Sequence, residues 1–420
     1  MNRKLAFFAL FLLPMALFLA TCTSDGERSN PSPGTQTQTD ISVTSTTDVV
    51  NGDVSSISAL IANPGPDGIS LCEAITAVNS EAAPHTITFS PTLIGQTISL
   101  TSRLPELTKD QVTVVGIKGT DGEPAVTIAG PSNAPPSSLG ILPVFASDFT
   151  ISDMRFVNVL AGAPAAIFIG AGSVPEIMIA PARIANVHIQ GCIFTNLGLS
   201  NTVYGILIAT NRGGGGSPGA AITDVTIANN RFYHNAMVLV EAGGTNSLIE
   251  NVAIERNEFS NEGADAVNFG LGIGPADFSV GSSISNVMIT DNTFTNFSGN
   301  ADGIGIGCAG TNGQIDTVLI SGNRFSDSTI PIEMAPSGIN CRTSGTQILR
   351  NTFANSDQSI TLAAIGLSVP GWPPSSENVI EDTVISGNII SGSQGPAIHV
   401  VGGAARASRN SIVTNGAKIV

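Results

Sequence analysis

From about residue 149 onward, apolar and polar positions repeat in the pattern Ile-x-Asn/Asp-Val-x-Ile-x-x-Asn-x-Phe. The clear copies of this pattern begin at Ile222, Ile249, Ile284, Ile315 and Ile380. Within most copies a Val and an Ile stand two positions apart, so both side chains face the same side of a strand. Each copy continues after the Phe into another apolar strand, such as Gly303-Ile-Gly-Ile306. The pattern predicts a solenoid built from short β-strands.

Two residue types mark equivalent points on successive coils. The repeated Asn falls at Asn230, Asn257, Asn292, Asn323, Asn351, Asn388 and Asn410. The repeated Phe, with looser copies included, falls at Phe156, Phe194, Phe232, Phe259, Phe294, Phe325 and Phe353. Asn tolerates left-handed backbone geometry, so it suits a tight turn that returns the Phe to the core. With coils about 4.8 Å apart, we expect a hydrogen-bonded Asn ladder and an internal stack of Phe rings.

Loops of changing length follow the second apolar strand of most coils. They span residues 171–183, 211–220, 271–283, 308–313, 335–345 and 367–378. The insertions occur at one point of the cycle, so they are expected to gather along one side of the solenoid. Repeat proteins commonly bind through such a side.

The segment Asp67-Gly-Ile-Ser-Leu-Cys-Glu-Ala-Ile-Thr-Ala-Val-Asn79 resembles the "DG…SLREAI…AN" segment that opens many bacterial surface β-helix proteins. The repeats behind it are similar to the pectin-lyase-like superfamily. The resemblance implies an all-β, right-handed parallel β-helix on the cell surface, with an N-terminal cap and first coils over 46–130 and repeats over 131–420. Cys72 stands where the family has Arg, so a salt bridge of the cap is in doubt. This fold hosts lyases, hydrolases, epimerases, adhesins and spacers, so the resemblance leaves the chemistry open.

The N-terminus has the layout of a secretory signal, predicted over 1–21. Arg3 and Lys4 precede an apolar run that is short for a membrane span and ends in Leu19-Ala20-Thr21-Cys22. That ending resembles a bacterial lipobox with Thr21 at an unusual position, which implies lipidation of Cys22. Ordinary cleavage nearby or an uncleaved anchor are the alternatives. Residues 22–45 are rich in Ser, Thr, Gln and Pro and predict a flexible tether. Thr23 follows Cys22 where an Asp would suggest retention at the inner membrane, so we expect the outer membrane, if the cell has one, or the cell surface.

The charge balance argues against a nucleic-acid partner. The chain carries 17 basic and 32 acidic residues, a formal net charge of −15. Removal of Arg3 and Lys4 with the signal would leave 15 basic residues against the same 32 acidic ones, a net charge of −17. Such a surface repels polyanions unless a cation intervenes.

Asp265 and Asp302 are the candidate catalytic residues. They open apolar strands on neighbouring coils, six and eight residues beyond Phe259 and Phe294. If the coils stack in register, the two carboxyl groups lie about 5 Å apart, near the spacing of a retaining glycosidase. The pair could also share a Ca²⁺ ion, which takes oxygen ligands. The simpler alternative is that both Asp residues cap turns.

Other candidate residues are few. Trp372, the single Trp, stands in a Pro-rich loop and is a candidate ligand contact, with loop packing as the alternative. Export permits disulfides, and Cys308 and Cys341 fall in successive insertion loops, so we expect them to pair. Cys192 occupies a ladder position and is expected to be a buried thiol. The four His residues show no metal-ligand spacing.

Two functions are therefore considered. The first is a non-catalytic surface module that binds glycans, mediates adhesion or acts as a spacer. We expect a monomer, because a capped solenoid needs no partner. The anchor, the tether and the missing Gly-His-Gly and Arg-Ile-Lys segments of polygalacturonases favour such a module. The second is a surface polysaccharide lyase or glycoside hydrolase, for which the fold family and the pair Asp265 and Asp302 argue. The sequence favours the first function.

Overall fold

The computed structural model describes most of the chain from residue 39 onward. The described residues are 39–82, 84–131, 140–159, 165–173, 181–197, 203–212, 218–234, 236–261, 269–298, 301–356, 360–363, 378–392, 395–401, 405–408 and 411–413. Cys22, the predicted signal peptide and most of the predicted tether lie outside these residues, and they stay predictions. Within the described part, no helix is both long enough and apolar enough to cross a membrane.

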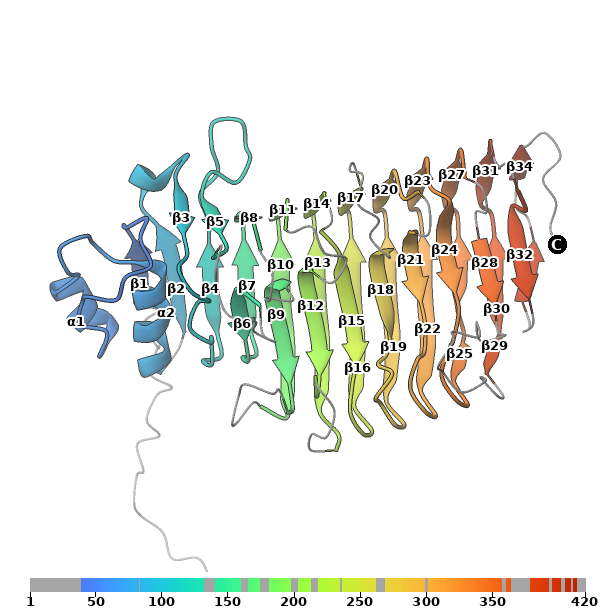
Figure 1. Ribbon diagram of the computed structural model, residues 1–420, viewed down its shortest axis with the longest axis horizontal. Coiled ribbons are helices and arrows are strands. Elements are labelled where there is room, and N and C mark those ends of the chain that lie inside the picture. The colour runs from blue at the N-terminus through green and yellow to red at the C-terminus, as the bar shows by residue number, and fades with distance from the viewer. Residues whose placement is uncertain are drawn as a thin grey trace, which may run out of the picture. The chain divides into compact units, whose positions relative to one another are not determined.

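Three parallel sheets, called A, B and C here, build the described domain (Figure 1). The main path of sheet A runs through β1 (Thr39–Val43), β2 (His85–Phe89), β4 (Val112–Val115), β7 (Phe149–Ser152), β10 (Arg183–Gln190), β13 (Ala221–Ala228), β16 (Leu248–Glu255), β19 (Ser283–Thr290), β22 (Gln314–Ser321), β26 (Gln347–Leu349), β30 (Thr383–Ser386) and β33 (Ala405–Ser408). Two further strands of sheet A are β25 (Arg342–Ser344), which pairs with β22, and β29 (Val379–Glu381), which pairs with β25.

Sheets B and C follow the same order along the chain. Sheet B contains β3 (Thr97–Ser99), β5 (Thr127–Ala129), β8 (Arg155–Val157), β11 (Ile193–Thr195), β14 (Arg231–Tyr233), β17 (Glu258–Ser260), β20 (Thr293–Thr295), β23 (Arg324–Ser326), β27 (Thr352–Ala354), β31 (Ile389–Ser391) and β34 (Ser411–Val413). Sheet C contains β6 (Leu142–Val144), β9 (Ala165–Ala171), β12 (Tyr204–Thr210), β15 (Val238–Ala242), β18 (Phe269–Pro275), β21 (Asp302–Ile306), β24 (Ile330–Met334), β28 (Ile360–Ala363) and β32 (Ile398–Val401). From β6 onward each coil contributes strands to all three sheets, which confirms the predicted right-handed parallel β-helix.

The predicted stack of Phe rings fills the interior. Phe156, Phe194, Phe232, Phe259, Phe294, Phe325 and Phe353 occupy paired positions of sheet B and are at most 1% exposed. Neighbouring rings lie nearly parallel, with centroids 4.7 to 5.3 Å apart. No coil could bury its ring alone, so each coil depends on its neighbours for stability.

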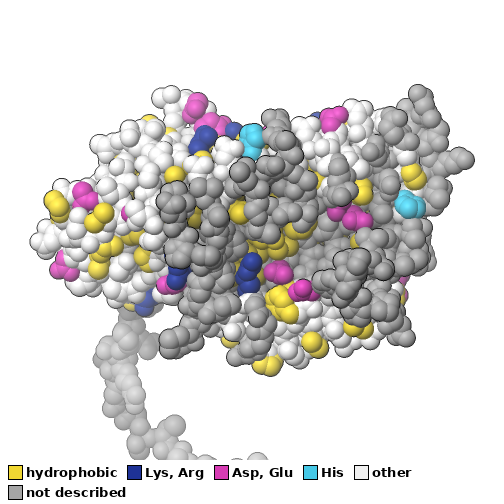
Figure 2. Space-filling view, viewed as in Figure 1, with side chains coloured by type: hydrophobic (Ala, Val, Ile, Leu, Met, Phe, Trp, Pro, Cys, Tyr) yellow, Lys and Arg dark blue, Asp and Glu magenta, His cyan; other side chains and the backbone are white. Residues whose placement is uncertain are grey.

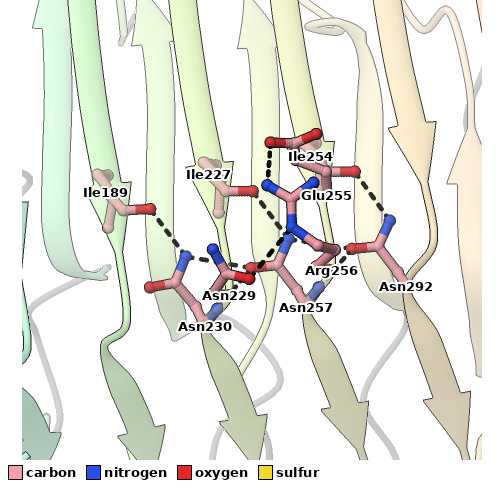
Figure 3. A network of polar contacts seen from close by, with 9 residues as sticks. All are labelled: Ile189, Ile227, Asn229, Asn230, Ile254, Glu255, Arg256, Asn257 and Asn292. Atoms are coloured by element: carbon pink, nitrogen blue, oxygen red, sulfur yellow. Dashed lines mark hydrogen bonds and ion pairs between the residues drawn. The ribbon is translucent and has the colours of Figure 1, made fainter.

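The Asn ladder runs along the turn between sheets A and B (Figure 3). Asn257 accepts the backbone N–H of Asn230 on its Oδ1 at 2.8 Å, and its own N–H donates to Oδ1 of Asn292 at 2.8 Å. Its Nδ2 also donates to the carbonyl oxygen of Ile227 at 2.8 Å. The same bonds recur up to Asn388, so the buried turn keeps its polar groups satisfied.

The ladder Asn was expected to take the left-handed conformation in this turn, because Asn tolerates that geometry. The structure shows that it does not. The residue before it takes positive φ, for example Asn229 (56°), Arg256 (54°) and Asp291 (57°). The ladder Asn is selected instead for its amide, which serves two coils at once. The preceding position faces solvent, and several residue types stand there.

A helical cap covers the N-terminal end of the core. It contains α1 (Ile57–Ala62) and α2 (Leu71–Ser80), followed by the short 3-10 helix η1 (Pro91–Leu93). A capping box between Ser70 and Glu73 begins α2, which buries Leu71, Ile75 and Val78. The cap predicted from the Asp67–Asn79 segment is therefore confirmed. Its first strand, β1, lies at 39–43 inside the predicted tether, so that stretch was wrongly assigned as flexible.

The variable loops join strands of sheet C to the next strands of sheet A. This holds for β9 to β10, β12 to β13, β18 to β19, β21 to β22, β24 to β25 and β28 to β29. Every one of these loops therefore leaves sheet C and enters sheet A, as expected for insertions at one point of the cycle.

Candidate functional site

A groove of about 610 Å³ lies on the outer face of sheet C, across β15, β18, β21 and β24. Its described lining includes the carboxyl groups of Glu241, Asp277, Asp302 and Glu333 together with the ring of Phe269. These residues come from four successive coils, so only the stacking of the solenoid brings them into one place.

Glycine residues leave the floor of the groove bare. In β18 and β21 every second residue is Gly, while Leu271, Ile273 and Ile304 between them point into the core. Gly272 pairs with Gly305 across the two strands. A Cβ on Gly272 would lie 2.6 Å from the ring of Phe269, so that ring covers a place where a side chain would otherwise stand.

Asp302 faces the groove because β21 does not alternate regularly at its start. Strict alternation would turn Asp302 inward with Ile304. A Cβ on Gly303, however, would lie 3.2 Å from the buried ring of Phe325, so Gly303 and Ile304 both face inward. The Asp302 carboxyl therefore lies outside, with Oδ2 3.5 Å from the place that a Cβ on Gly305 would take.

Asp302 and Glu333 form a carboxyl pair. Glu333 is opposite Gly305 in the register of β21 and β24, which places it one coil beyond Asp302. Only 9% of Asp302 is exposed. Burial raises the pKa of Asp302 to about 9, and the negative charge of Glu333 and a hydrogen bond with it act in the same direction. The pair therefore holds a shared proton at neutral pH.

A second acidic pair lies farther along the groove. Glu241 of β15 is opposite Gly274, and Asp277 follows the end of β18. Burial raises the pKa of Glu241, Arg212 lowers it, and Asp277 raises it further. Arg212 is not among the described residues that line the groove, and its Nη1 is buried without a hydrogen-bond partner among the described residues. On the face shown in Figure 2, acidic side chains (magenta) lie near the centre beside a basic one (dark blue).

The sequence placed Asp302 in a site but not beside its actual partner. Opposite Asp302 on the preceding coil stands Phe269, four residues beyond Asp265 in the sequence. Asp265 itself lies outside the described residues and stays a candidate. Glu333 was missed, although its position in Ile330-Pro-Ile-Glu-Met334 between two inward residues was a signal of an outward carboxylate.

The other candidates have separate positions. Trp372 lies outside the described residues, and its role in binding stays a prediction. Cys308 and Cys341 are joined by a disulfide with their Cα atoms 5.9 Å apart. It links the segment after β21 to the residue directly before β25, and Gly307 and Ala309 on either side of Cys308 line the groove. Cys72 and Cys192 are buried free thiols, and burial raises the pKa of each to about 12, which makes both poor nucleophiles.

The described side chains do not match a calcium site; Asp265, which the sequence suggested as a ligand together with Asp302, lies outside them. Ca²⁺ takes six to eight oxygen ligands, usually with several carboxylates. Within the described part of the chain, no three His, Cys, Asp or Glu side chains come close enough together to hold a metal ion. The Asp302 carboxyl is also protonated at neutral pH, which makes it a poor ligand. No chemical step is therefore assigned to calcium here.

The pKa of Asp302 predicts how stability depends on pH. The folded state keeps this proton up to about pH 9, whereas the unfolded carboxyl loses it near 3.8. Between these values the folded state binds more protons, so stability present below pH 4 falls as pH rises, by up to about 1.4 kcal/mol per pH unit. Asp302→Asn should flatten this dependence when urea unfolding is measured at pH 5, 7 and 9. Asp382→Asn, at an exposed position, should keep the wild-type slope. Equal slopes for wild type and Asp302→Asn would contradict the prediction.

Comparison with known proteins reveals similarity in structure alone. No family model matches the chain, and no curated protein matches it. Among solved structures, the alginate lyase from Paenibacillus sp. str. FPU-7 is 13% identical with a TM-score of 0.40, over 91% of this chain and 97% of the other. Endopolygalacturonase I from Stereum purpureum is 13% identical with a TM-score of 0.39, over 89% and 94%. The A-module of a mannuronan C-5 epimerase from Azotobacter vinelandii is 13% identical with a TM-score of 0.35, over 83% and 93%. Similarities this low assign no activity to this chain.

Proposed function

We propose that the groove on sheet C binds a polysaccharide and hydrolyses it, with Asp302 as the general acid and Glu333 as the residue that holds its proton in place. The sequence favoured a non-catalytic module because of the predicted anchor and tether and the missing polygalacturonase segments, although the pair Asp265 and Asp302 argued for an enzyme. The carboxyl pair and the groove around it change that preference. The proposal extends to a surface enzyme, since export is predicted by the N-terminus.

One observation carries the proposal: a carboxyl group that keeps its proton at neutral pH opens onto a groove. Glycoside hydrolysis needs an acid that protonates the leaving oxygen, and a raised carboxyl pKa is how such an acid is kept ready. Asp302 meets this requirement by burial and by its contact with Glu333. Asp302 is therefore in the protonation state that the reaction requires.

Each step of the proposed hydrolysis must account for the proton that Asp302 gives away. Asp302 gives its proton to the glycosidic oxygen as the bond from that oxygen to the anomeric carbon breaks. Water adds to the anomeric carbon, and its proton passes to a carboxylate, so the protein regains the proton that it gave. The two catalytic carboxyl groups of a glycosidase are about 5 Å or more apart, which is farther than two hydrogen-bonded carboxyl groups. Asp302 and Glu333 therefore act as one acid, and Glu241 and Asp277 are the described carboxylates that could activate the water.

An activity screen with the purified protein tests the proposal. Plant and bacterial polysaccharides would be incubated with and without calcium, and both new reducing ends and ultraviolet-absorbing unsaturated products would be followed. We expect new reducing ends, activity that falls as pH rises through about 9, and a loss of about 10²- to 10⁴-fold in Asp302→Asn. Asp382→Asn is the matched control and should keep full activity. Turnover that survives in Asp302→Asn would refute the assigned acid.

A non-catalytic glycan-binding module is the second candidate. The ring of Phe269 lies over Gly272 beside Leu239 and Pro275, which provides an apolar surface of the kind on which sugar rings stack. Binding of a sugar ring to such a surface requires no proton transfer. Binding of a glycan without any product across the panel, by protein shown to be folded, would favour this module over the enzyme.

The membrane anchor is proposed on the sequence alone. We expect Cys22 to carry lipid and to hold the domain at the outer membrane or cell surface, as a monomer. Mass spectrometry of the N-terminal peptide of the exported protein tests this directly. An unmodified Cys22, or cleavage at another residue, would remove the anchor and leave the groove proposal unaffected.

A further inference from the structure

The charges around the groove bear on the class of polysaccharide that it accepts. The described lining contains four carboxyl groups, those of Glu241, Asp277, Asp302 and Glu333, and no basic side chain. With one proton on the Asp302 and Glu333 pair, the lining still carries net negative charge at neutral pH. A partly buried cleft of one sign concentrates its field, because the protein around it has a low dielectric constant.

No basic residue is available in the chain that forms the middle of the groove. Between Arg256 and Arg324 the sequence contains no Lys or Arg, and this stretch includes both β18 and β21 with everything between them. No Lys occurs from residue 119 to residue 417. Basic side chains to neutralise a bound acidic sugar are therefore missing from this stretch.

Most arginines elsewhere in the repeats lie away from sheet C, on which the groove is formed. Those on strands of sheets A and B or in the turn between them are Arg155, Arg183, Arg231, Arg256, Arg324, Arg342, Arg350 and Arg406. Several are already paired, as Arg231 is with Glu123 and Arg342 with Glu381. Arg212 is the described arginine close to the groove; it is not among the lining residues, and its charge lowers the pKa of Glu241.

We infer that the ligand of this groove is a polysaccharide without acidic groups, either neutral or carrying amino groups, and that polyuronic acids are excluded. A chain with one carboxylate per sugar would place its charges beside Glu241, Asp277 and Glu333 with no basic side chain in the described lining to balance them. A neutral chain loses nothing to this repulsion, and an amino sugar gains from it. The inference rests on the proposed function, since it names the substrate class of the same groove.

Glycan pairs that differ only in charge test the inference. Fully methyl-esterified homogalacturonan and its de-esterified form share one backbone, as do the hexamers of N-acetylglucosamine and of glucosamine. Binding to the purified wild-type protein would be measured by affinity electrophoresis and calorimetry in about 20 mM salt and again in about 500 mM salt. We expect the de-esterified form to bind at least about tenfold more weakly than the esterified form at low salt, with the difference shrinking as salt screens the charges.

Two double variants locate the effect. Glu241→Gln with Asp277→Asn should reduce the discrimination between the esterified and de-esterified forms by about tenfold. The control, Asp224→Asn with Glu250→Gln, removes the same charge from strands of sheet A and should leave the ratio unchanged. An equal effect of both variants would mean that net charge rather than the groove discriminates, which would overturn the inference.

The two proposals fail in different ways. Binding of the de-esterified form as tightly as the esterified form at low salt would overturn the substrate class and leave a glycan site in place. Absence of binding and turnover with both pairs and with the wider neutral panel, by folded protein, would overturn the proposed function and the inference with it.

Discussion

Replacing Phe259 by Ala is expected to lower the free energy of unfolding by about 3–5 kcal/mol. Phe259 is fully buried, and its ring lies 4.7 Å from the rings of both Phe232 and Phe294. Truncation removes the buried ring and leaves a cavity that the coils above and below cannot fill, because both are held in place by the Asn ladder. The loss is therefore expected at the upper end of the range for core substitutions.

Urea unfolding followed by far-ultraviolet circular dichroism measures this loss. A solenoid is stabilised by interfaces between neighbours, so a break at its centre is also expected to broaden the transition or split it in two. Phe278→Ala, at a ring that is 39% exposed, is the control and should cost less than about 1 kcal/mol. A loss of similar size in both variants would mean that the stack contributes no more than an exposed ring.

Replacing Glu73 by Ala is expected to destabilise the cap by about 3–5 kcal/mol. This carboxylate is fully buried and accepts backbone N–H groups from Asn51 at 2.7 Å, Gly52 at 2.6 Å and Ser70 at 2.8 Å. Alanine removes the acceptor of all three donors; Ser70 is fully buried, so its N–H loses its partner out of reach of water, at a cost of about 1–3 kcal/mol. The variant also breaks the capping box of α2.

Hydrogen exchange of α2 and urea unfolding test the second expectation. Exchange in α2 should speed up well before the central coils lose protection, since the cap is one end of a solenoid. Asp53→Ala, in the same cap but exposed, should change stability by less than about 1 kcal/mol. Slow exchange that is retained in α2 of Glu73→Ala would show that the three donors find other partners.

The repeat pattern alone determined the fold and much of the core. The spacing of Ile, Val, Asn and Phe is local, and a strand alternates every two residues, so inward and outward positions of sheets A and B could be assigned from the chain. The ladder at Asn230 to Asn388 and the Phe stack followed from stacking identical coils, and the structure has both. The cap followed from the resemblance of the Asp67–Asn79 segment.

The candidate site was decided by tertiary structure. Coils of unequal length hide which residues of sheet C lie opposite each other, so the chain could not show that Asp302 stands opposite Phe269 and next to Glu333. Gly303 faces the core, against the ring of Phe325, and so does the next residue, Ile304. This break in alternation places Asp302 on the outer face, where strict alternation would have turned it inward. A shared proton depends on a distance and on burial, and both exist only once separate coils are stacked.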